Sequence, residues 1–179
     1  MSDLDDIMKH YNNWELRRQT GVPVPKSRRL METWIEKASL ANPWKNGMVY
    51  FVIVDKKNDE FLGVARFFGV KSAHNRARLS VSIYDSQHRS KGYGKDAVRV
   101  MLWIGFHVLG FHSINLDTME DNLIAIHIFE EAGFKRVGIL RETELVDGKH
   151  IGLLYMDILR DEFMEKYPSG TVIGESSTD

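Results

Sequence analysis

The spacing of apolar residues changes at Met48 from the period of a helix to the period of a strand. Before that point Leu4, Ile7 and Tyr11 are separated by three and four residues, as on one face of a helix. After it come two runs rich in β-branched and aromatic residues, MVYFVIVD and FLGVARFF, separated by the polar turn KKNDE. Such a pair of runs is typical of a β-hairpin. A chain that mixes both periods is expected to pack helices on a sheet.

Turn and capping residues divide the rest of the chain into further elements. We predict a first helix of about four turns from Leu4 to Arg18 and a second helix capped by Ser27. Polarity alternates from Ala77 to Tyr84, which predicts a third strand. The remaining predicted elements are a helix stopped by Gly110, a strand at 113–118, a helix at 123–132 closed by Gly133, a strand at 134–140 and a final hairpin turning at Asp147-Gly148.

This order of elements predicts an α/β (α+β) layered domain with a mixed sheet flanked by helices. The order is helix, helix, three strands, helix, strand, helix and two strands. We expect one domain at residues 1–166, since no linker or internal repeat interrupts it. Residues 167–179 are small and polar without periodicity, and we expect this tail to be disordered.

Composition excludes several classes of function. Lys and Arg number 24 against 25 Asp and Glu, which argues against a nucleic-acid partner. The absence of cysteine excludes disulfides, thiolate nucleophiles and an acyl-cysteine intermediate. The seven histidines show no metal-ligand spacing, so no metal is predicted. We expect no secretory signal and no membrane partner, which leaves the cytoplasm as the default location.

The segment Arg89-Ser90-Lys91-Gly92-Tyr93-Gly94 lies between a predicted strand and a predicted helix. Glycines let the backbone approach a ligand, and the free N–H groups of a helix's first turn bind anions. Lys91, Lys95 and Arg99 recur every fourth residue and add positive charge. A diphosphate fits this pattern, while a glycine turn before a solvated basic face is the competing interpretation. The spacings of the Walker loop and the dinucleotide fingerprint are absent, which disfavours nucleotide hydrolysis.

A second pattern follows on the next predicted helix. Asn122, Ala125, Phe129 and Ala132 are three, four and three residues apart and therefore share one face. An extended ligand could lie along this face, although a capping asparagine followed by core residues has the same spacing. His127 is expected on the opposite side of the helix, away from such a ligand.

These two segments together resemble the GNAT superfamily of N-acetyltransferases, in particular its ribosomal-protein N-terminal acetyltransferase and spermidine acetyltransferase branch. Residues 83–94 resemble the acetyl-CoA motif R/Q-x-x-G-x-G/A, and residues 122–134 resemble the motif N-x-x-A followed by an aromatic residue and Gly-Phe. The resemblance covers Asp3 to Phe163 and implies a mixed, largely antiparallel twisted sheet. The family pattern begins with a short strand, for which the residues before Leu4 leave little room.

The resemblance implies acetyl-CoA as co-substrate and assigns residues to it. The glycine loop would hold the pyrophosphate through backbone N–H groups, with His88 beside a phosphate or merely solvated. The third strand would pair with pantetheine like an added strand, and Asn122 would hydrogen-bond the cofactor. The residues expected to bind it are Val81, Ser82, Ile83, His88, Arg89, Ser90, Lys91, Gly92, Tyr93, Gly94, Asn122, Ala125 and Phe129.

The catalytic groups of the family are not all present. Phe129 stands where many relatives carry a tyrosine proposed to protonate the leaving thiolate, and a phenyl ring cannot donate a proton. We expect Asp117 to act as the base through water, and Tyr84 to act as an alternative acid, with Tyr155 as a weaker candidate. An exposed strand-end acid and packed aromatic rings are the competing interpretations.

The acceptor is expected between the helix pair, with Trp34 to Trp44, and the final hairpin. Glu142 and Glu144 alternate on one strand and, with Asp117, could attract a cationic amine, unless they form a solvated face.

The resulting prediction is acetyl transfer from acetyl-CoA to a primary amine by direct attack, without an acyl-enzyme. The acceptor would be a protein N-terminus or a polyamine-like small molecule, and a homodimer is included among the expected partners. The alternative is a catalytically weak acyl-CoA sensor, which Phe129 supports.

Overall fold

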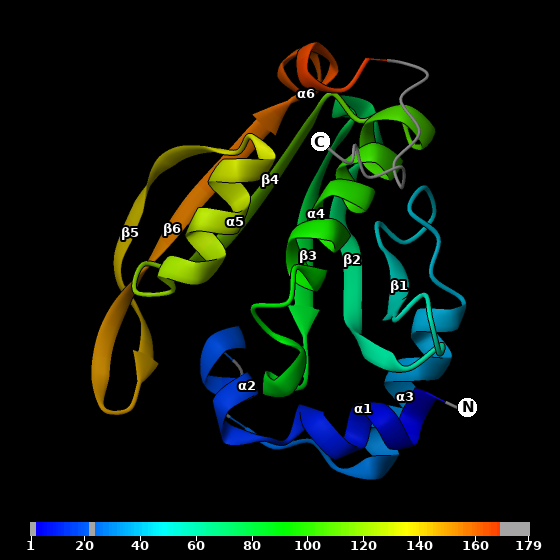
Figure 1. Cartoon of the computed structure of the whole chain (residues 1–179), viewed down its shortest axis with the longest axis vertical. Coiled ribbons are helices and arrows are strands. Elements are labelled where there is room, and N and C mark those ends of the chain that lie inside the picture. Colours follow the sequence, from blue (N-terminus) through cyan, green and yellow to red (C-terminus); the bar gives the residue numbers. More distant parts are fainter. Residues whose placement is uncertain (1–2, 22–23, 169–179) are drawn as a thin grey trace.

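One six-stranded sheet organises the computed structural model, which describes residues 3–21 and 24–168. Its strand order is β1-β2-β3-β4-β6-β5, and every neighbouring pair is antiparallel except β3 and β4 (Figure 1). The strands are β1 Val49–Val54, β2 Phe61–Lys71, β3 Arg76–Ile83, β4 Ser113–Met119, β5 Lys135–Val146 and β6 Lys149–Leu159. This confirms the predicted mixed, largely antiparallel sheet. The predicted tail beyond Pro168 lies outside the described residues.

Helices cover the sheet on both sides and form two cores. They are α1 Asp3–Tyr11, α2 Trp14–Thr20, α3 Arg28–Ser39, α4 Tyr93–Trp103, α5 Leu123–Ala132 and α6 Arg160–Lys166. The larger core, with Phe67, Phe106 and Phe163, lies under α4, α5 and α6. The smaller core joins α1–α3 to Val64 and Tyr84. No helix in the described part of the chain is long and apolar enough to cross a membrane.

The predicted single N-terminal helix is wrong, because two asparagines divide it. The α1 helix ends at Tyr11, and the Asn13 side chain accepts a hydrogen bond of 2.8 Å from the Glu15 N–H, which caps α2. Asn12 exchanges two 2.9 Å bonds with the backbone of Lys26. These local bonds compete with the helical ones. The predicted Ser27 cap of α3 is confirmed, at 3.3 Å from the Leu30 N–H.

The C-terminal half follows the prediction with two additions. Asp147 and Gly148 have φ of 50° and 75°, as a two-residue hairpin turn requires. The predicted strand at 134–140 continues to Val146 through a bulge between Leu140 and Glu144. The α6 helix was not predicted, although it places a fully buried Phe163 in the core.

The helix after the glycine loop changes to a π-helical turn at Ile104–Val108 before Gly110. A Cβ on Gly105 in this turn would lie 2.6 Å from Ile114 Cδ1 and 3.0 Å from Phe67 Cζ. Ordinary van der Waals contact needs more space than this, so the close packing of the turn on the sheet depends on glycine.

We expect Gly105→Ala to lower the free energy of unfolding by about 1–3 kcal/mol, the usual cost of overpacking a core. Urea denaturation measures this change. Gly138→Ala is the matched control, because a Cβ there would meet no atom within 4 Å. Equal urea midpoints for the two variants would show that the π-turn absorbs the methyl group without strain.

The parallel pair β3 and β4 separates soon after it forms. Only Arg76–Arg78 pair with Ser113–Asn115, and Figure 1 shows the two strands diverging beyond these residues. From Leu79 to Ile83 the β4-facing edge of β3 therefore has no strand partner. An unpaired strand edge at the centre of a sheet offers hydrogen-bonding groups to a ligand.

Candidate active site

A cavity of about 460 Å³ occupies the space where β3 and β4 diverge. Its walls come from β1–β4, the N-terminal helices, α5 and the final hairpin. The residues that line it are Tyr11, Leu16, Gly21, Lys26, Trp34, Tyr50, Val64, Arg66, Phe68, Leu79, Ser80, Val81, Ser82, Tyr84, Leu116, Asp117, Thr118, Met119, Asn122, Ala125, Phe129, Glu144 and Leu153. Of the two sequence motifs, residues 122–134 contribute Asn122, Ala125 and Phe129 to this cavity, whereas residues 83–94 contribute only Tyr84 and the glycine loop itself does not line it.

The open edge of β3 directs main-chain groups into this gap. The Tyr84 N–H donates to the Leu62 carbonyl of β2 at 2.9 Å, so this residue's main chain points away from β4. Hydrogen-bonding direction alternates along an antiparallel strand. The N–H and C=O groups of Val81 and Ile83 consequently point toward β4. These lie within the stretch, Val81 to Ile83, that the family resemblance expects to pair with pantetheine.

The glycine loop ends at the N-terminus of α4, as predicted. Ser90 and Gly92 have φ of 57° and 88°, and α4 begins at Tyr93. The first helical bond is donated by the Asp96 N–H to Gly92 at 3.0 Å. The N–H groups of the first turn, 93–95, donate to no backbone carbonyl within residues 3–21 and 24–168. Such groups and the helix dipole attract an anion.

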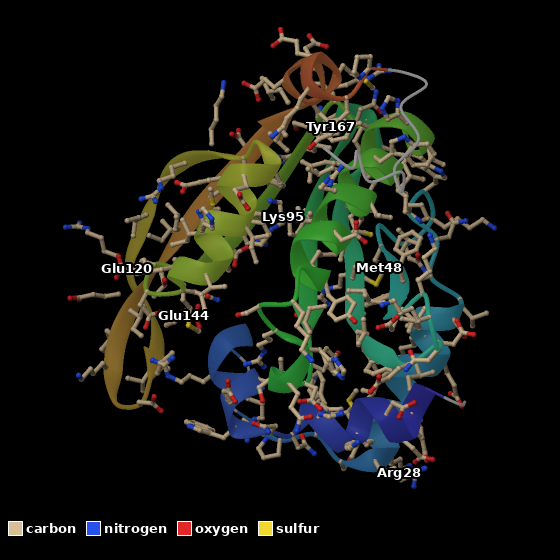
Figure 2. All side chains as sticks on the ribbon, viewed as in Figure 1. Arg28, Met48, Lys95, Glu120, Glu144 and Tyr167 are labelled. Atoms are coloured by element: carbon tan, nitrogen blue, oxygen red, sulfur yellow. The ribbon has the colours of Figure 1, made fainter. Side chains whose placement is uncertain are left out.

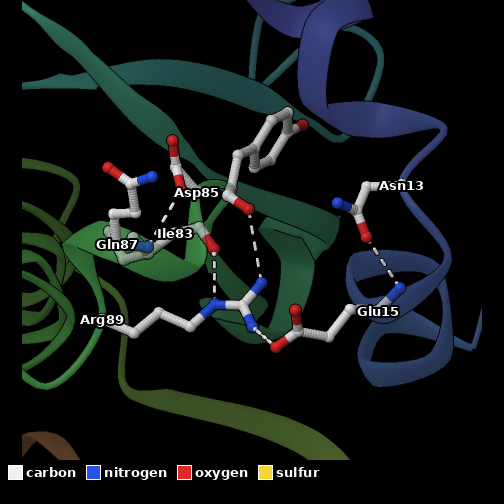
Figure 3. Close-up of polar contacts among 7 residues, drawn as sticks. Asn13, Glu15, Ile83, Asp85, Gln87 and Arg89 are labelled. Carbon is white, nitrogen blue, oxygen red and sulfur yellow. Dashed lines mark hydrogen bonds and ion pairs between the residues drawn. The ribbon is translucent and has the colours of Figure 1, made fainter.

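The Arg89 side chain contributes to the fold on the other side of the loop. Figure 3 shows its guanidinium pointing toward Glu15 of α2, with an ion pair of 2.6 Å. The same group donates to the carbonyls of Tyr84 at 3.3 Å and Ile83 at 3.5 Å. Arg89 therefore ties α2 to the end of β3, and its side chain is not available to a phosphate in this conformation.

Two other loop side chains are also held by neighbouring segments. His88 Nε2 lies 3.2 Å from Glu60, and the Tyr93 hydroxyl donates to Asp55 at 2.5 Å. That bond lowers the pKa of Asp55 and raises the pKa of Tyr93. These contacts fix the loop onto the β1–β2 turn, so the main chain is the part of the loop left to bind an anion.

Two of the three basic residues expected along α4 have partners of their own. Lys95 forms an ion pair of 3.1 Å with Glu131 of α5, which lowers the pKa of that carboxylate. The Arg99 guanidinium lies 5.5 Å from the Tyr167 ring centre, and Figure 2 shows the sites of Lys95 and Tyr167 on the ribbon. Lys91 is exposed, without an ion pair to the described part of the chain, and is the remaining cation near the loop.

The residues that share one face of α5 fit both interpretations of their spacing, a helix cap with core residues and a ligand-facing surface. The Asn122 side chain caps α5 by accepting from the Ala125 N–H at 3.3 Å, and both residues line the cavity together with Phe129. Ala132 is buried in the core. The prediction for His127 is confirmed, since its side chain is 72% exposed beside Glu131.

The two candidate catalytic residues both line the cavity, with different surroundings. Asp117 forms an ion pair with Arg78 of β3, so an adjacent cation already balances its charge. Tyr84 is buried between Tyr11 and Phe61, with ring centres 6.1 and 5.5 Å away. Burial raises the pKa of its phenol, which keeps the group protonated at neutral pH. Tyr155 lies opposite Asp117 in the β4–β6 pair.

The expected acidic acceptor side is only partly formed. Glu144 lines the cavity, and Figure 2 places it on the hairpin strand. Glu142 has a φ of 56° within the β5 bulge and is not among the lining residues, because the bulge breaks the alternation that the sequence suggested. Trp34 lines the cavity, whereas Trp44 packs against Phe111 with ring centres 6.0 Å apart.

The α2 helix is tied to both sides of the diverging strands. At one side is the ion pair of Glu15 with Arg89, and at the other Arg18 binds Asp147 at 2.8 Å and Asp121 at 3.4 Å. This connection of α2 was not predicted from the sequence.

The two cations Lys26 and Arg66 in the cavity wall were also not predicted from the sequence. The position of Arg66 inside the otherwise apolar run FLGVARFF was the sequence signal that could have indicated it.

The described residues contain no group of three or more potential metal ligands.

A GNAT acetyltransferase domain model matches residues 1–135, and the chain belongs to this family. Similar proteins include the spermidine N(1)-acetyltransferases of Vibrio cholerae, 26% identical over 116 residues, and of Escherichia coli K12, 25% identical over 116 residues. These alignments cover 65% and 64% of this chain, and 66% and 62% of the two relatives. The chain thus matches slightly less than two thirds of their length.

Solved structures confirm the fold. A Vibrio cholerae spermidine N-acetyltransferase in complex with CoA and spermine superposes with a TM-score of 0.82 at 24% sequence identity. The superposition covers 91% of this chain and 93% of that protein. The predicted GNAT fold is therefore confirmed at the level of the architecture.

Proposed function

We propose that this chain transfers an acetyl group from acetyl-CoA to a primary amine by direct attack. The observation that carries the proposal is that the open edge of β3 lines the cavity and ends beside the N-terminus of α4, where a Cβ on Gly94 would lie 3.9 Å from Ile83 Cγ1. An extended chain ending in a diphosphate matches this pair of features. Family membership and the names of the relatives support the same reaction.

The main chain would supply most of the cofactor contacts. The N–H groups at Tyr93 and Gly94 would bind the pyrophosphate, and Val81 and Ile83 would pair with pantetheine. The cavity-facing side of α5 would contact the same chain. Acetyl-CoA would supply the activated acyl group as a thioester.

The chain's own groups can assist three requirements of acyl transfer. The Ile83 N–H points into the gap and could polarise the thioester carbonyl, whereas the Tyr84 N–H is occupied by Leu62. Asp117, held by Arg78, would take the amine proton through water. The protonated Tyr84 phenol would donate to the leaving thiolate.

A panel of amines tests the proposal directly. We expect thiol release from acetyl-CoA, and an acetylated product by mass spectrometry, with at least one of spermidine, spermine or a short peptide with a free N-terminus. The names of the relatives support a polyamine as the acceptor, while a protein N-terminus as the acceptor and a homodimer stay predictions. Tight acetyl-CoA binding with no acetylation of any amine would contradict the proposal.

That contrary outcome would favour the second candidate, an acyl-CoA sensor. The observation behind it is Phe129, which places a ring without a proton donor in the cavity wall. A sensor and an enzyme would bind acetyl-CoA alike and differ only in thiol release.

A further inference from the structure

Two cations line the cavity without an ion-pair partner in the described structure. Arg66 of β2 and Lys26, two residues before α3, are both half-buried in its wall. Neither forms an ion pair with residues 3–21 or 24–168. An unpaired cation in a partly buried wall is costly unless a ligand supplies the opposite charge.

The position of Arg66 is fixed by the sheet and by aromatic rings. In the strand register it lies between Tyr50 of β1 and Ser80 of β3. Its guanidinium is 4.6 Å from the Phe68 ring centre and 5.9 Å from that of Tyr50. Stacking on rings leaves the edge of a guanidinium free for a bidentate contact with a carboxylate or phosphate.

The neighbouring Arg78 is placed like Arg66 but has a carboxylate partner. The Arg78 guanidinium lies 4.9 Å from the centre of the same Phe68 ring and forms an ion pair with Asp117. Lys26 is placed like Arg66, with its ammonium 5.0 Å from the Tyr11 ring centre. Of these three cations, only Arg78 has a carboxylate partner within the described chain.

The opposite charge left in the wall is Glu144. Its carboxylate forms no ion pair with residues 3–21 or 24–168. Because Arg78 balances the charge of Asp117, the cavity wall has two cations and one anion, Glu144, without an ion-pair partner in the described chain. A polyamine carries only positive charge and would meet Arg66 and Lys26 unfavourably.

We propose that the acceptor amine also carries an anionic group, a carboxylate or phosphate, which Arg66 binds with help from Lys26. Glu144 attracts the ammonium end of the same molecule. The proposal rests on the acetyl transfer proposed above and narrows its acceptor to a zwitterionic small molecule. Ser80 and Ser82, which line the same wall, add hydroxyl donors for the anionic group.

Acceptors that differ only at the far end test this proposal. γ-Aminobutyrate, n-butylamine and putrescine share a primary amine on a short chain that ends in a carboxylate, a methyl group or a second ammonium. We expect kcat/KM for γ-aminobutyrate to exceed that for n-butylamine by about tenfold, with putrescine lowest. Aminopropyl phosphate compares phosphate with carboxylate. Equal values for all four, or a preference for putrescine, would overturn the proposal.

Substitutions of Arg66 give a second test of the zwitterionic acceptor. Arg66→Gln should lower kcat/KM for γ-aminobutyrate, relative to that for n-butylamine, by about tenfold, mainly through KM. Arg66→Glu should move the preference toward putrescine. Arg29→Gln is the matched control, because this arginine is exposed on α3 outside the cavity. Circular dichroism checks that each variant is folded.

The outcomes separate this inference from the proposed function. If no amine is acetylated, acetyl transfer fails, and calorimetric binding of γ-aminobutyrate with and without Arg66 still decides the charge assignment. If amines are acetylated but Arg66→Gln has no selective effect, acetyl transfer stands and the zwitterionic acceptor is wrong.

Discussion

Gly92→Val is expected to weaken acetyl-CoA binding by at least about tenfold, which corresponds to about 1.4 kcal/mol. Gly92 has a φ of 88°, a conformation that a β-branched residue adopts only with strain. A Cβ there would meet no atom within 4 Å, so the requirement for glycine comes from the backbone angle and not from crowding inside the protein. Relief of about 1–3 kcal/mol of strain would move the loop that presents the N–H groups of α4.

Arg89→Ala is expected to weaken the same binding by roughly threefold or less, because exposed or partly exposed ion pairs contribute little. Its guanidinium faces Glu15 and two carbonyls, so its loss affects the loop only through the anchoring of α2. Glu15→Gln removes the same ion pair and should reproduce the small effect.

Isothermal titration calorimetry with acetyl-CoA measures both changes. Gly110→Val is the matched control for strain, since Gly110 has a φ of 68°, a Cβ there would meet no atom within 4 Å, and the residue lies outside the cavity. If Gly110→Val weakens binding as much as Gly92→Val, general destabilisation explains the loss. A larger loss for Arg89→Ala than for Gly92→Val would show that side chains, not the main chain, carry the pyrophosphate site.

The sequence predicted those parts of the fold that depend on local signals. Ser27, Gly133 and the Asp147-Gly148 turn each act on residues a few positions away, and each does so in the structure. The break between α1 and α2 has a local cause as well, in Asn12 and Asn13, but the apolar period continues across it. The α6 helix depends on burying Phe163 in the distant core, which no local pattern displays.

The site divides in the same way between local and distant effects. The start of α4 after a strand and a glycine loop was anticipated from the residues, and a pairing edge on the third strand was expected from the family resemblance, whereas the early separation of β3 from β4 was not predicted. Side-chain partners were not, since Arg89 and Glu15 are 74 residues apart in sequence and Arg78 meets Asp117 only after the sheet forms. The acidic acceptor side was expected from alternation on a regular strand, and the β5 bulge removes Glu142 from it.

Phe129→Tyr is expected to raise kcat by about tenfold while leaving acetyl-CoA affinity within about twofold, if proton donation to the leaving thiolate limits the reaction. Phe129 is half-buried in the cavity wall, with its ring centre 5.7 Å from that of Phe134, so a tyrosine ring can keep the same packing. A well-placed general acid contributes about 100-fold or more, and an introduced phenol without evolved partners should reach only part of this.

The pH profile distinguishes acid catalysis from a change in packing. A phenol donates only while protonated, so the gain in kcat should disappear as the pH rises through about 10, the ordinary pKa of tyrosine. Phe129→Leu is the control for packing and should show no such dependence. An unchanged kcat in Phe129→Tyr would mean that protonation is not limiting or that Tyr84 already supplies the proton, and Tyr84→Phe would then be the slow variant. Full activity in Tyr84→Phe and no gain in Phe129→Tyr would exclude both positions as the source of the proton and leave solvent or the other phenols of the wall, Tyr11 and Tyr50.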